Sequence, residues 1–155
     1  MARNIYMSIK PSKAWSAIAP LFFAAIHAYA SSPQLTVEVH RDANCGCCKS
    51  WISYMESKGF EVIDRVEQDM IKVKSDLQVP RHLASCHTAT LNGRFIEGHV
   101  PAAQVIELSK RSDLAGIAVP GMPAGSPGME VPGIAHPYEV IGVSVGEEKV
   151  IATYP

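Results

Sequence analysis

Three of the chain's four cysteines lie in one short stretch, residues 44–51, which reads NCGCCKSW. Cys45 and Cys48 form a C-x-x-C pair, and Cys47 lies between them. Such a pair on the first turn of a helix can shuttle electrons as dithiol and disulfide. The third thiol would compete in each exchange step, whereas three sulfurs at one helix terminus suit a soft metal ion. The stretch therefore indicates redox or metal chemistry.

The fourth cysteine, Cys86, stands apart in SCHTAT. If the chain brings Cys86 back to Cys45, Cys47 and Cys48, four thiolates converge on one place. Thiolate-rich sites select Cu(I), Zn(II) or iron–sulfur clusters, and thioether neighbours favour Cu(I). Two alternatives stay open, because Cys86 as an ordinary buried cysteine or as half of a structural disulfide also fits the sequence.

Zinc is a weaker prediction than copper, and the histidines are predicted to play supporting roles. A four-cysteine zinc site usually contains two separated C-x-x-C pairs, and this chain contains one. His87 follows Cys86 on a segment expected to be extended, where successive side chains point to opposite faces. We interpret His87 and His99 as residues that support the metal ligands or pack, with direct ligation by His99 as the lesser alternative.

Two methionines extend the candidate metal site. Met122 and Met129 lie in residues 116–137, which contain five glycines and five prolines among twenty-two residues. This composition predicts a segment without regular structure, and long loops of this kind are usually functional or disordered. Methionine fills hydrophobic cores by default, but this segment has little core to fill. We therefore include both thioethers among the candidate copper ligands.

The elements that must position these residues follow from hydrophobic periodicity and turn signals. The pattern predicts strands at 35–41 and 61–66 and two extended runs around Asn92-Gly93. It predicts three helices: one that ends at Gly59, one that ends before Pro80, and one that covers 102–110. It also predicts a closing hairpin, in which strands 138–145 and 149–155 flank GEE. In the first helix, Trp51, Ile52 and Met55 should lie along one face, with Tyr54 as a further candidate for that face. The predicted fold is α/β, a thioredoxin-like β-α-β-α-β-β-α sandwich with a Gly/Pro/Met-rich loop and a C-terminal β-hairpin.

This topology places the cysteine cluster where chemistry is favoured. The cluster follows the first strand and opens the first helix, where that fold keeps its redox pair and where the helix dipole favours thiolate over thiol. In thioredoxin-like folds, the strand before the corresponding hairpin usually begins with a cis-proline that faces the redox pair. Here Cys86 and His87 occupy the corresponding stretch, and Pro80 lies too far back to serve.

The N-terminus predicts export. Residues 1–30 contain a basic start, an apolar run and Ala28-Tyr29-Ala30, the order of a cleaved secretory signal peptide. The remaining residues 31–155 form one predicted domain, located in the periplasm. Residues 1–30 hold three of the fourteen basic residues and none of the fifteen acidic ones, so the remainder carries a net charge of −4. This charge argues against nucleic acid as a partner, and no later segment has the length of a membrane span.

Three blocks of sequence resemble one known family. The blocks CGCCKSWISYMESKGF, SCHTATLNGRFIEGHVPA and GIAVPGMPAGSPGME are similar to the CopG-like family of small exported metal-binding proteins of copper resistance. The resemblance implies a thioredoxin-like fold that binds copper through its cysteines, as a mononuclear or multinuclear Cu(I)–sulfur site. It points to Cys45, Cys47, Cys48 and Cys86, with Met122 and Met129 as candidates. Many members have histidine where this chain has Tyr54, which puts a metal role at that position in doubt.

Two functions are carried forward. The first is a periplasmic copper-binding protein that sequesters, transfers or interconverts copper, with copper ions and other periplasmic copper-handling proteins as partners. The second is a thiol–disulfide oxidoreductase, because C-x-x-C opens a predicted thioredoxin-like helix. The sequence favours a metal-binding protein over an enzyme and leaves enzymatic copper or thiol redox activity open. A plain structural domain with one disulfide is the third alternative.

Overall fold

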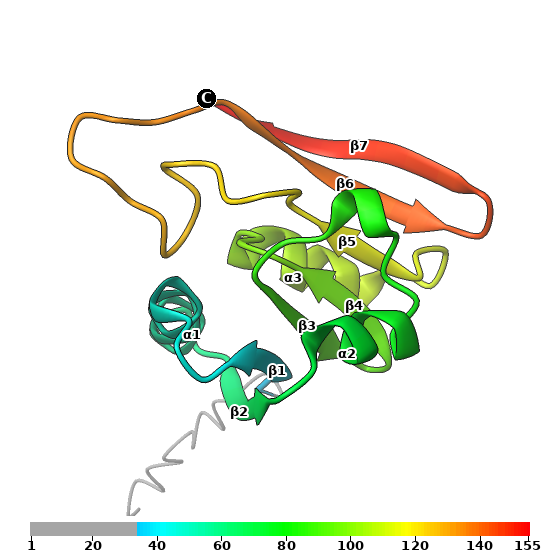
Figure 1. Ribbon diagram of the computed structural model, residues 1–155. Coiled ribbons are helices and arrows are strands. Elements are labelled where there is room, and N and C mark those ends of the chain that lie inside the picture. The colour runs from blue at the N-terminus through cyan, green and yellow to red at the C-terminus, as the bar shows by residue number, and fades with distance from the viewer. Residues whose placement is uncertain (1–33) are drawn as a thin grey trace, which may run out of the picture. The chain divides into compact units, whose positions relative to one another are not determined.

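The computed structural model describes residues 34–155, so the predicted signal peptide at residues 1–30 lies outside the described residues. The predicted β-α-β-α-β-β-α order is confirmed from the first strand to the third long helix, and three further strands follow (Figure 1). The elements are β1 (Thr36–Asp42), α1 (Gly46–Ser57), β2 (Glu61–Glu67), α2 (Met70–Asp76), the short 3₁₀ helix η1 (Arg81–Leu83), β3 (His87–Leu91), β4 (Arg94–Glu97), α3 (Ala102–Lys110), β5 (Gly116–Ala118), β6 (Tyr138–Ser144) and β7 (Glu147–Tyr154).

The seven strands between residues 34 and 155 belong to one mixed sheet in the order β2-β1-β3-β4-β5-β6-β7. The pairs β1/β2 and β4/β5 are parallel, and the other neighbours are antiparallel. The predicted α/β class is confirmed. The hairpin between β3 and β4 turns at Asn92 and Gly93, with φ of 52° and 76°. Positive φ at both central residues is the geometry that Asn-Gly favours in two-residue hairpins.

Two predictions about the second half of the chain are wrong in detail. Residues 116–118 form β5 in the middle of the sheet, although the Gly/Pro-rich composition predicted no regular structure there. Ile117 and Ala118 are fully buried, and the first proline comes only at Pro120, so this short apolar run can pair with both neighbours. In the final hairpin the turn falls at Val145 and Gly146, and the two acidic residues that follow belong to β7.

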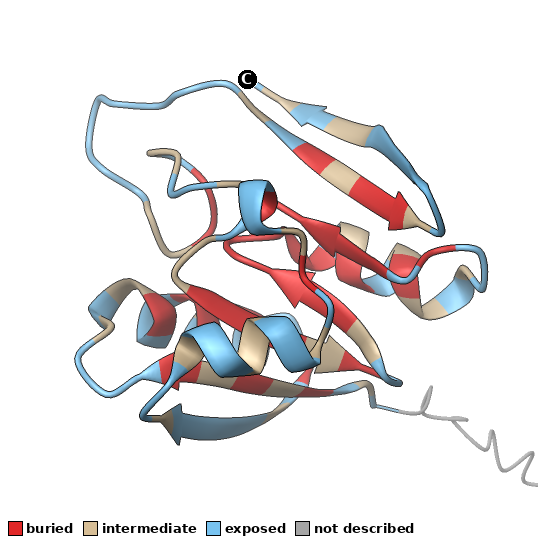
Figure 2. Ribbon diagram, turned by 45° about the vertical axis from the view of Figure 1, so that its right-hand side comes forward, coloured by how far each residue is buried: buried red, intermediate tan, exposed pale blue. Residues whose placement is uncertain are grey.

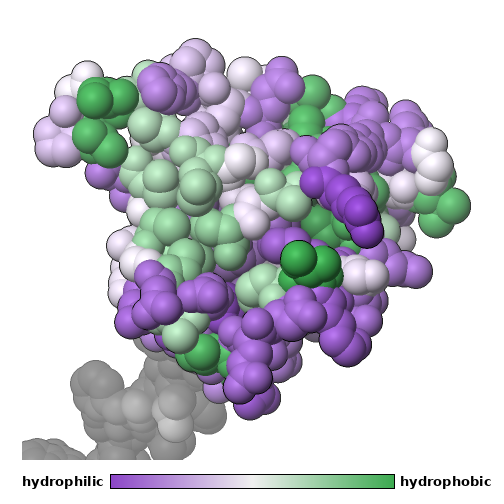
Figure 3. Space-filling view, in the orientation of Figure 1, coloured by the Kyte–Doolittle hydropathy of each residue, from purple (hydrophilic) through white to green (hydrophobic). Residues whose placement is uncertain are grey.

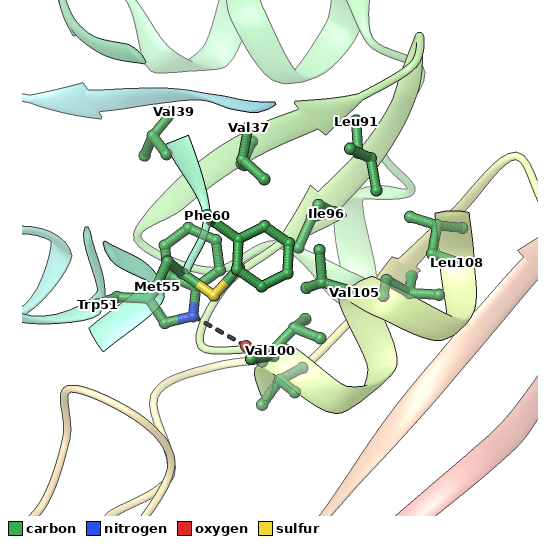
Figure 4. Close-up of a cluster of buried hydrophobic side chains, with 14 of the residues drawn as sticks. Val37, Val39, Trp51, Met55, Phe60, Leu91, Ile96, Val100, Val105 and Leu108 are labelled. Carbon is green, nitrogen blue, oxygen red and sulfur yellow. Dashed lines mark hydrogen bonds between the residues drawn. The ribbon is translucent and has the colours of Figure 1, made fainter. Parts of the chain in front are cut away.

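Helices α1 and α3 pack on the same core. Trp51, Ile52 and Met55 of α1 are buried, which confirms that they share one face of this helix. They join residues of α3 and of the central strands in one hydrophobic cluster (Figure 4). Within this cluster the indole N–H of Trp51 donates to the carbonyl of Val100 at 2.9 Å. The hydrogen bond fixes α1 to the segment between β4 and α3.

The other face of the sheet carries a smaller cluster and a more exposed helix. Phe95, Ala118 and Val143 pack there with Val79 and Leu83, which lie around η1. Helix α2 has no buried residue, and the colours of Figure 2 show that the edge strands β2 and β7 are more exposed than the central strands. Between residues 34 and 155, none of the helices combines the length and hydropathy that a membrane span requires.

Candidate metal centre

The cysteine cluster forms at the N-terminus of α1. Cys45 is the N-cap residue, and its sulfur accepts the backbone N–H of Cys48 at 3.3 Å. Cys45 and Cys48 are joined as a disulfide, and Cys47 is a half-buried free thiol. Residues three apart face the same side of a helical turn, so the local C-x-x-C spacing is enough to bring this pair together.

Cys86 reaches the cluster from a bend between η1 and β3. Its sulfur lies 3.8 Å from that of Cys47, and the sulfurs of Cys45 and Cys47 are 3.6 Å apart. The sulfurs of all four cysteines lie within 4.8 Å of one another. Cys86 is a free thiol, since the disulfide joins Cys45 and Cys48. The tertiary structure thus brings together four sulfurs that are separated by up to 41 positions in the sequence.

Two histidines adjoin the sulfur of Cys86. His87 Nδ1 lies 3.3 Å from this sulfur, and His99 Nε2 lies 3.0 Å from it. The expectation that Cys86 and His87 point to opposite faces is wrong, because Cys86 lies in the bend and the strand begins only at His87. Donor atoms of Cys86, His87 and His99 also lie within 4.8 Å of one another. Imidazole nitrogen therefore supplements the thiol donors.

The hydrogen bonds of the histidines define their chemistry. His99 Nδ1 lies 2.8 Å from the carbonyl of Pro127. A carbonyl only accepts, so Nδ1 carries the proton and a neutral ring presents the lone pair of Nε2 to Cys86. The ring of His87 lies between Trp51 and His99, with centroid distances of 4.6 and 5.1 Å. Its Nε2 is buried and has no hydrogen-bond partner among residues 34–155, an uncommon state for a native side chain.

Burial controls the protonation of these groups. Burial, reinforced by the nearby Cys47 thiol, raises the pKa of Cys86 to about 12. Burial also lowers the pKa of His99. Burial, with smaller contributions from the charges of His99 and Lys74, lowers the pKa of His87 well below its usual value. At neutral pH the imidazoles are neutral, which is their metal-binding form. The Cys86 thiol therefore keeps its proton at neutral pH, and a metal ion that bound there would have to displace that proton.

The loop between β5 and β6, residues 119–137, packs against α1 next to the cluster. A side chain on Gly128 would meet the backbone nitrogen of Trp51 at 2.7 Å, so the loop and the helix are in close contact there. Met129 follows this contact and is half-buried, whereas Met122 is 55% exposed. No hydrogen bond within residues 34–155 joins either thioether to the cysteine sulfurs. The structure thus brings the four cysteines together, and copper ligation by Met122 and Met129 stays a prediction.

His99 lies nearer to the cysteine sulfurs than predicted, at 3.0 Å from Cys86 Sγ, although the hairpin signal in the sequence already implied this position. Cys86 lies six residues before Asn92, and His99 lies six residues after Gly93. Antiparallel pairing of β3 and β4 returns the chain to the same end of the sheet, so two residues equally spaced about the turn become neighbours. Tyr54 has a structural role, since its hydroxyl accepts the N–H at the start of α3.

The donor set decides which chemistry this site can support. Four sulfurs and two neutral imidazoles are soft and borderline donors, which favour Cu(I) over hard cations. Two sulfurs are joined in the disulfide, and its reduction by two electrons and two protons frees two further thiols. The same residues can therefore exist as a disulfide with two thiols or as four thiolate ligands.

Comparison with known proteins places the chain in a family. A family model described as "Protein of unknown function, DUF411" matches residues 83–129. No curated protein sequence matches the chain. A solved structure named "Copper resistance protein copG- Form 2" is 54% identical, with a TM-score of 0.77, and the match covers 79% of this chain and 99% of that one. A second, named "Form 1", is also 54% identical, with a TM-score of 0.76 and coverage of 79% and 98%. The chain therefore belongs to the CopG family of copper resistance proteins.

Proposed function

We propose that this protein binds Cu(I) through Cys45, Cys47, Cys48 and Cys86 and acts in copper resistance or homeostasis. The observation that carries the proposal is the convergence of four sulfurs within 4.8 Å at the start of α1. A set of thiolates this close suits a thiophilic monovalent ion and allows one sulfur to bridge two ions. The names of the two similar solved structures support copper as the ion.

The neighbouring histidines fit the same proposal. A copper ion at the sulfur cluster would find neutral imidazoles within reach of Cys86. Weakly hydrophobic residues gather on the surface over α1 and the adjacent loop (Figure 3). Hydrophobic surroundings limit the access of water to a metal site and thereby tune the ion's redox properties. Met122 and Met129 remain candidate ligands.

The setting of this function is part of the proposal. Export by residues 1–30 would place the domain in the periplasm, where it would hold copper or pass it to other copper-handling proteins. The stoichiometry of a Cu(I) titration gives the number of copper ions that bind. A single ion would leave most thiolate lone pairs unused, whereas several ions would share bridging sulfurs.

Titration of the reduced domain with Cu(I) under a competing chelator tests the proposal. Wild-type protein should compete strongly, and a Cys45→Ser/Cys48→Ser double variant should lose most of its affinity because half of the sulfur donors are gone. Val145→Ser, at a fully exposed turn position, serves as the matched control and should bind like wild type. Equal affinity of the double variant and wild type would exclude the cysteine cluster as the site. Met122→Leu and Met129→Leu measure the contribution of each thioether.

Thiol–disulfide exchange is the second candidate function, and the Cys45–Cys48 disulfide at the N-cap favours it. In this function one thiolate of the reduced pair attacks a substrate disulfide and forms a mixed disulfide, and the second cysteine then displaces the substrate. The protein ends as the Cys45–Cys48 disulfide and the substrate as a dithiol, so two electrons pass to the substrate. Insulin reduction by metal-free protein distinguishes the two functions. Rapid turnover without copper would favour exchange, whereas slow turnover with tight Cu(I) binding would favour copper handling.

A further inference from the structure

A buried ionic network lies on the α2 side of the sheet, next to the bend that carries Cys86. Glu97 of β4 is fully buried. Its Oε1 accepts the ammonium of Lys74 at 2.5 Å, and its Oε2 accepts the hydroxyl of Thr88 at 2.6 Å. Lys74 also donates to that hydroxyl at 2.9 Å. The carboxylate is thus held from α2 and from the paired strand β3.

The same carboxylate also holds the bend itself. The backbone N–H of Ser85 donates to Oε1 of Glu97 at 2.6 Å. Ser85 is the residue immediately before Cys86, and its hydroxyl donates to the carbonyl of Gly121. A Cβ on Gly98 would lie 2.6 Å from the side chain of Ser85, so the Gly98 backbone lies directly against that side chain. Among the contacts of Ser85, the hydrogen bond to the Glu97 carboxylate is charge-assisted, and charge-assisted hydrogen bonds are the stronger class.

Stability alone does not explain a lysine and a glutamate at these positions. A buried ion pair often contributes no more stability than hydrophobic residues of similar volume, because desolvation opposes the attraction. A fully buried carboxylate that accepts a specific backbone N–H does, however, set the position of that backbone.

We propose that Glu97, held in place by Lys74, is a positioning residue for the metal centre: it fixes the Ser85–Cys86 bend so that the Cys86 sulfur meets Cys47. This inference rests on the proposed copper function. None of the hydrogen bonds of Glu97 described above involves a sulfur, so Glu97 acts through the backbone of Ser85. Supporting residues outside the ligand set typically change metal affinity by about 10- to 100-fold when mutated.

A matched pair of variants isolates the hydrogen bond from the ion pair. Lys74→Met/Glu97→Gln removes both charges but keeps an amide oxygen that can accept the Ser85 N–H. Lys74→Met/Glu97→Met removes the charges and the acceptor while preserving side-chain length. The first should hold the Ser85 N–H better than the second, because only the first keeps an acceptor for it. Glu97→Asp provides a third variant for the case that the second does not fold, because it keeps the charge and withdraws the oxygen from Ser85.

Two measurements on metal-free protein test the positioning directly. We expect hydrogen exchange of the Ser85 amide to be at least about tenfold faster in Lys74→Met/Glu97→Met than in Lys74→Met/Glu97→Gln. In a Cys47→Ser background with the Cys45–Cys48 disulfide intact, we expect faster alkylation of Cys86 in the same variant. A change in overall stability would accelerate exchange throughout the sheet, so amides of β1 provide the reference.

Cu(I) competition completes the test. The Glu97→Met variant should lose about tenfold in affinity relative to the Glu97→Gln variant. Equal Ser85 exchange and equal affinity in the matched pair, or a Glu97→Asp variant that protects Ser85 like wild type, would overturn the inference. Failure of wild type to bind Cu(I) would instead refute the proposed function, while the metal-free measurements would still decide the role of Glu97.

Discussion

Gly128 offers a quantitative test of the contact between the β5–β6 loop and the helix that carries the cysteines. Its φ is +80°, and a Cβ placed there would lie 2.7 Å from the backbone nitrogen of Trp51. Gly133 in the same loop has a similar φ of +76° but no atom within 4 Å of an added Cβ. Gly128→Ala and Gly133→Ala therefore share the backbone penalty and differ in the steric contact.

The expected magnitudes follow from these two terms. An L-residue in the left-handed region costs about 1–2 kcal/mol, which is the whole effect expected for Gly133→Ala. At Gly128 the added methyl would be about 0.7 Å closer to Trp51 than ordinary contact at 3.4 Å. The obstacle is helix backbone, which cannot rotate away, and overpacking of this kind typically costs a further ~1–3 kcal/mol. We expect Gly128→Ala to destabilise the protein by about 2–5 kcal/mol in total.

Urea unfolding of both variants measures the difference, and limited proteolysis measures whether the loop has left the helix. Because the Pro127 carbonyl binds His99 Nδ1, displacement of the loop should also speed the alkylation of Cys47 and Cys86. Equal unfolding free energies and equal proteolysis of the two variants would refute the close packing of the loop on α1.

Two further substitutions and one pH titration test local interactions. Trp51→Phe should lower the free energy of unfolding by about 1–3 kcal/mol, because the buried carbonyl of Val100 loses its donor; an unchanged urea midpoint would contradict this. Tyr54→Phe should cost about 1 kcal/mol, since the N–H at the start of α3 loses its acceptor, again by urea unfolding. The hydrogen bond from Arg111 holds the pKa of the Asp113 carboxyl at about 2. Its stabilising effect should be present above pH ~4 and lost as the pH falls towards 2; an NMR titration midpoint near 4 would disprove the pairing.

Local patterns were sufficient to predict much of the fold. The apolar face of α1, the Asn92-Gly93 turn and the bounds of α3 depend on residues close in sequence, and all three are confirmed. The strand β5 was missed because three apolar residues carry no periodicity of their own. Its conformation comes from pairing with β4 and β6, which arrive from distant parts of the chain.

The candidate site likewise combines features that depend on local sequence with features that depend on tertiary contacts. The soft donor set and the placement of Cys45, Cys47 and Cys48 at one helical turn follow from local sequence, because spacing within a turn is local geometry. The Asn92-Gly93 hairpin pairs His99 with Cys86, but tertiary packing alone brings Cys86 to the other sulfurs and the Ser85 N–H to Glu97. These contacts depend on strand register and on a buried hydrogen bond between backbone and side chain, and neither leaves a periodic trace in the sequence.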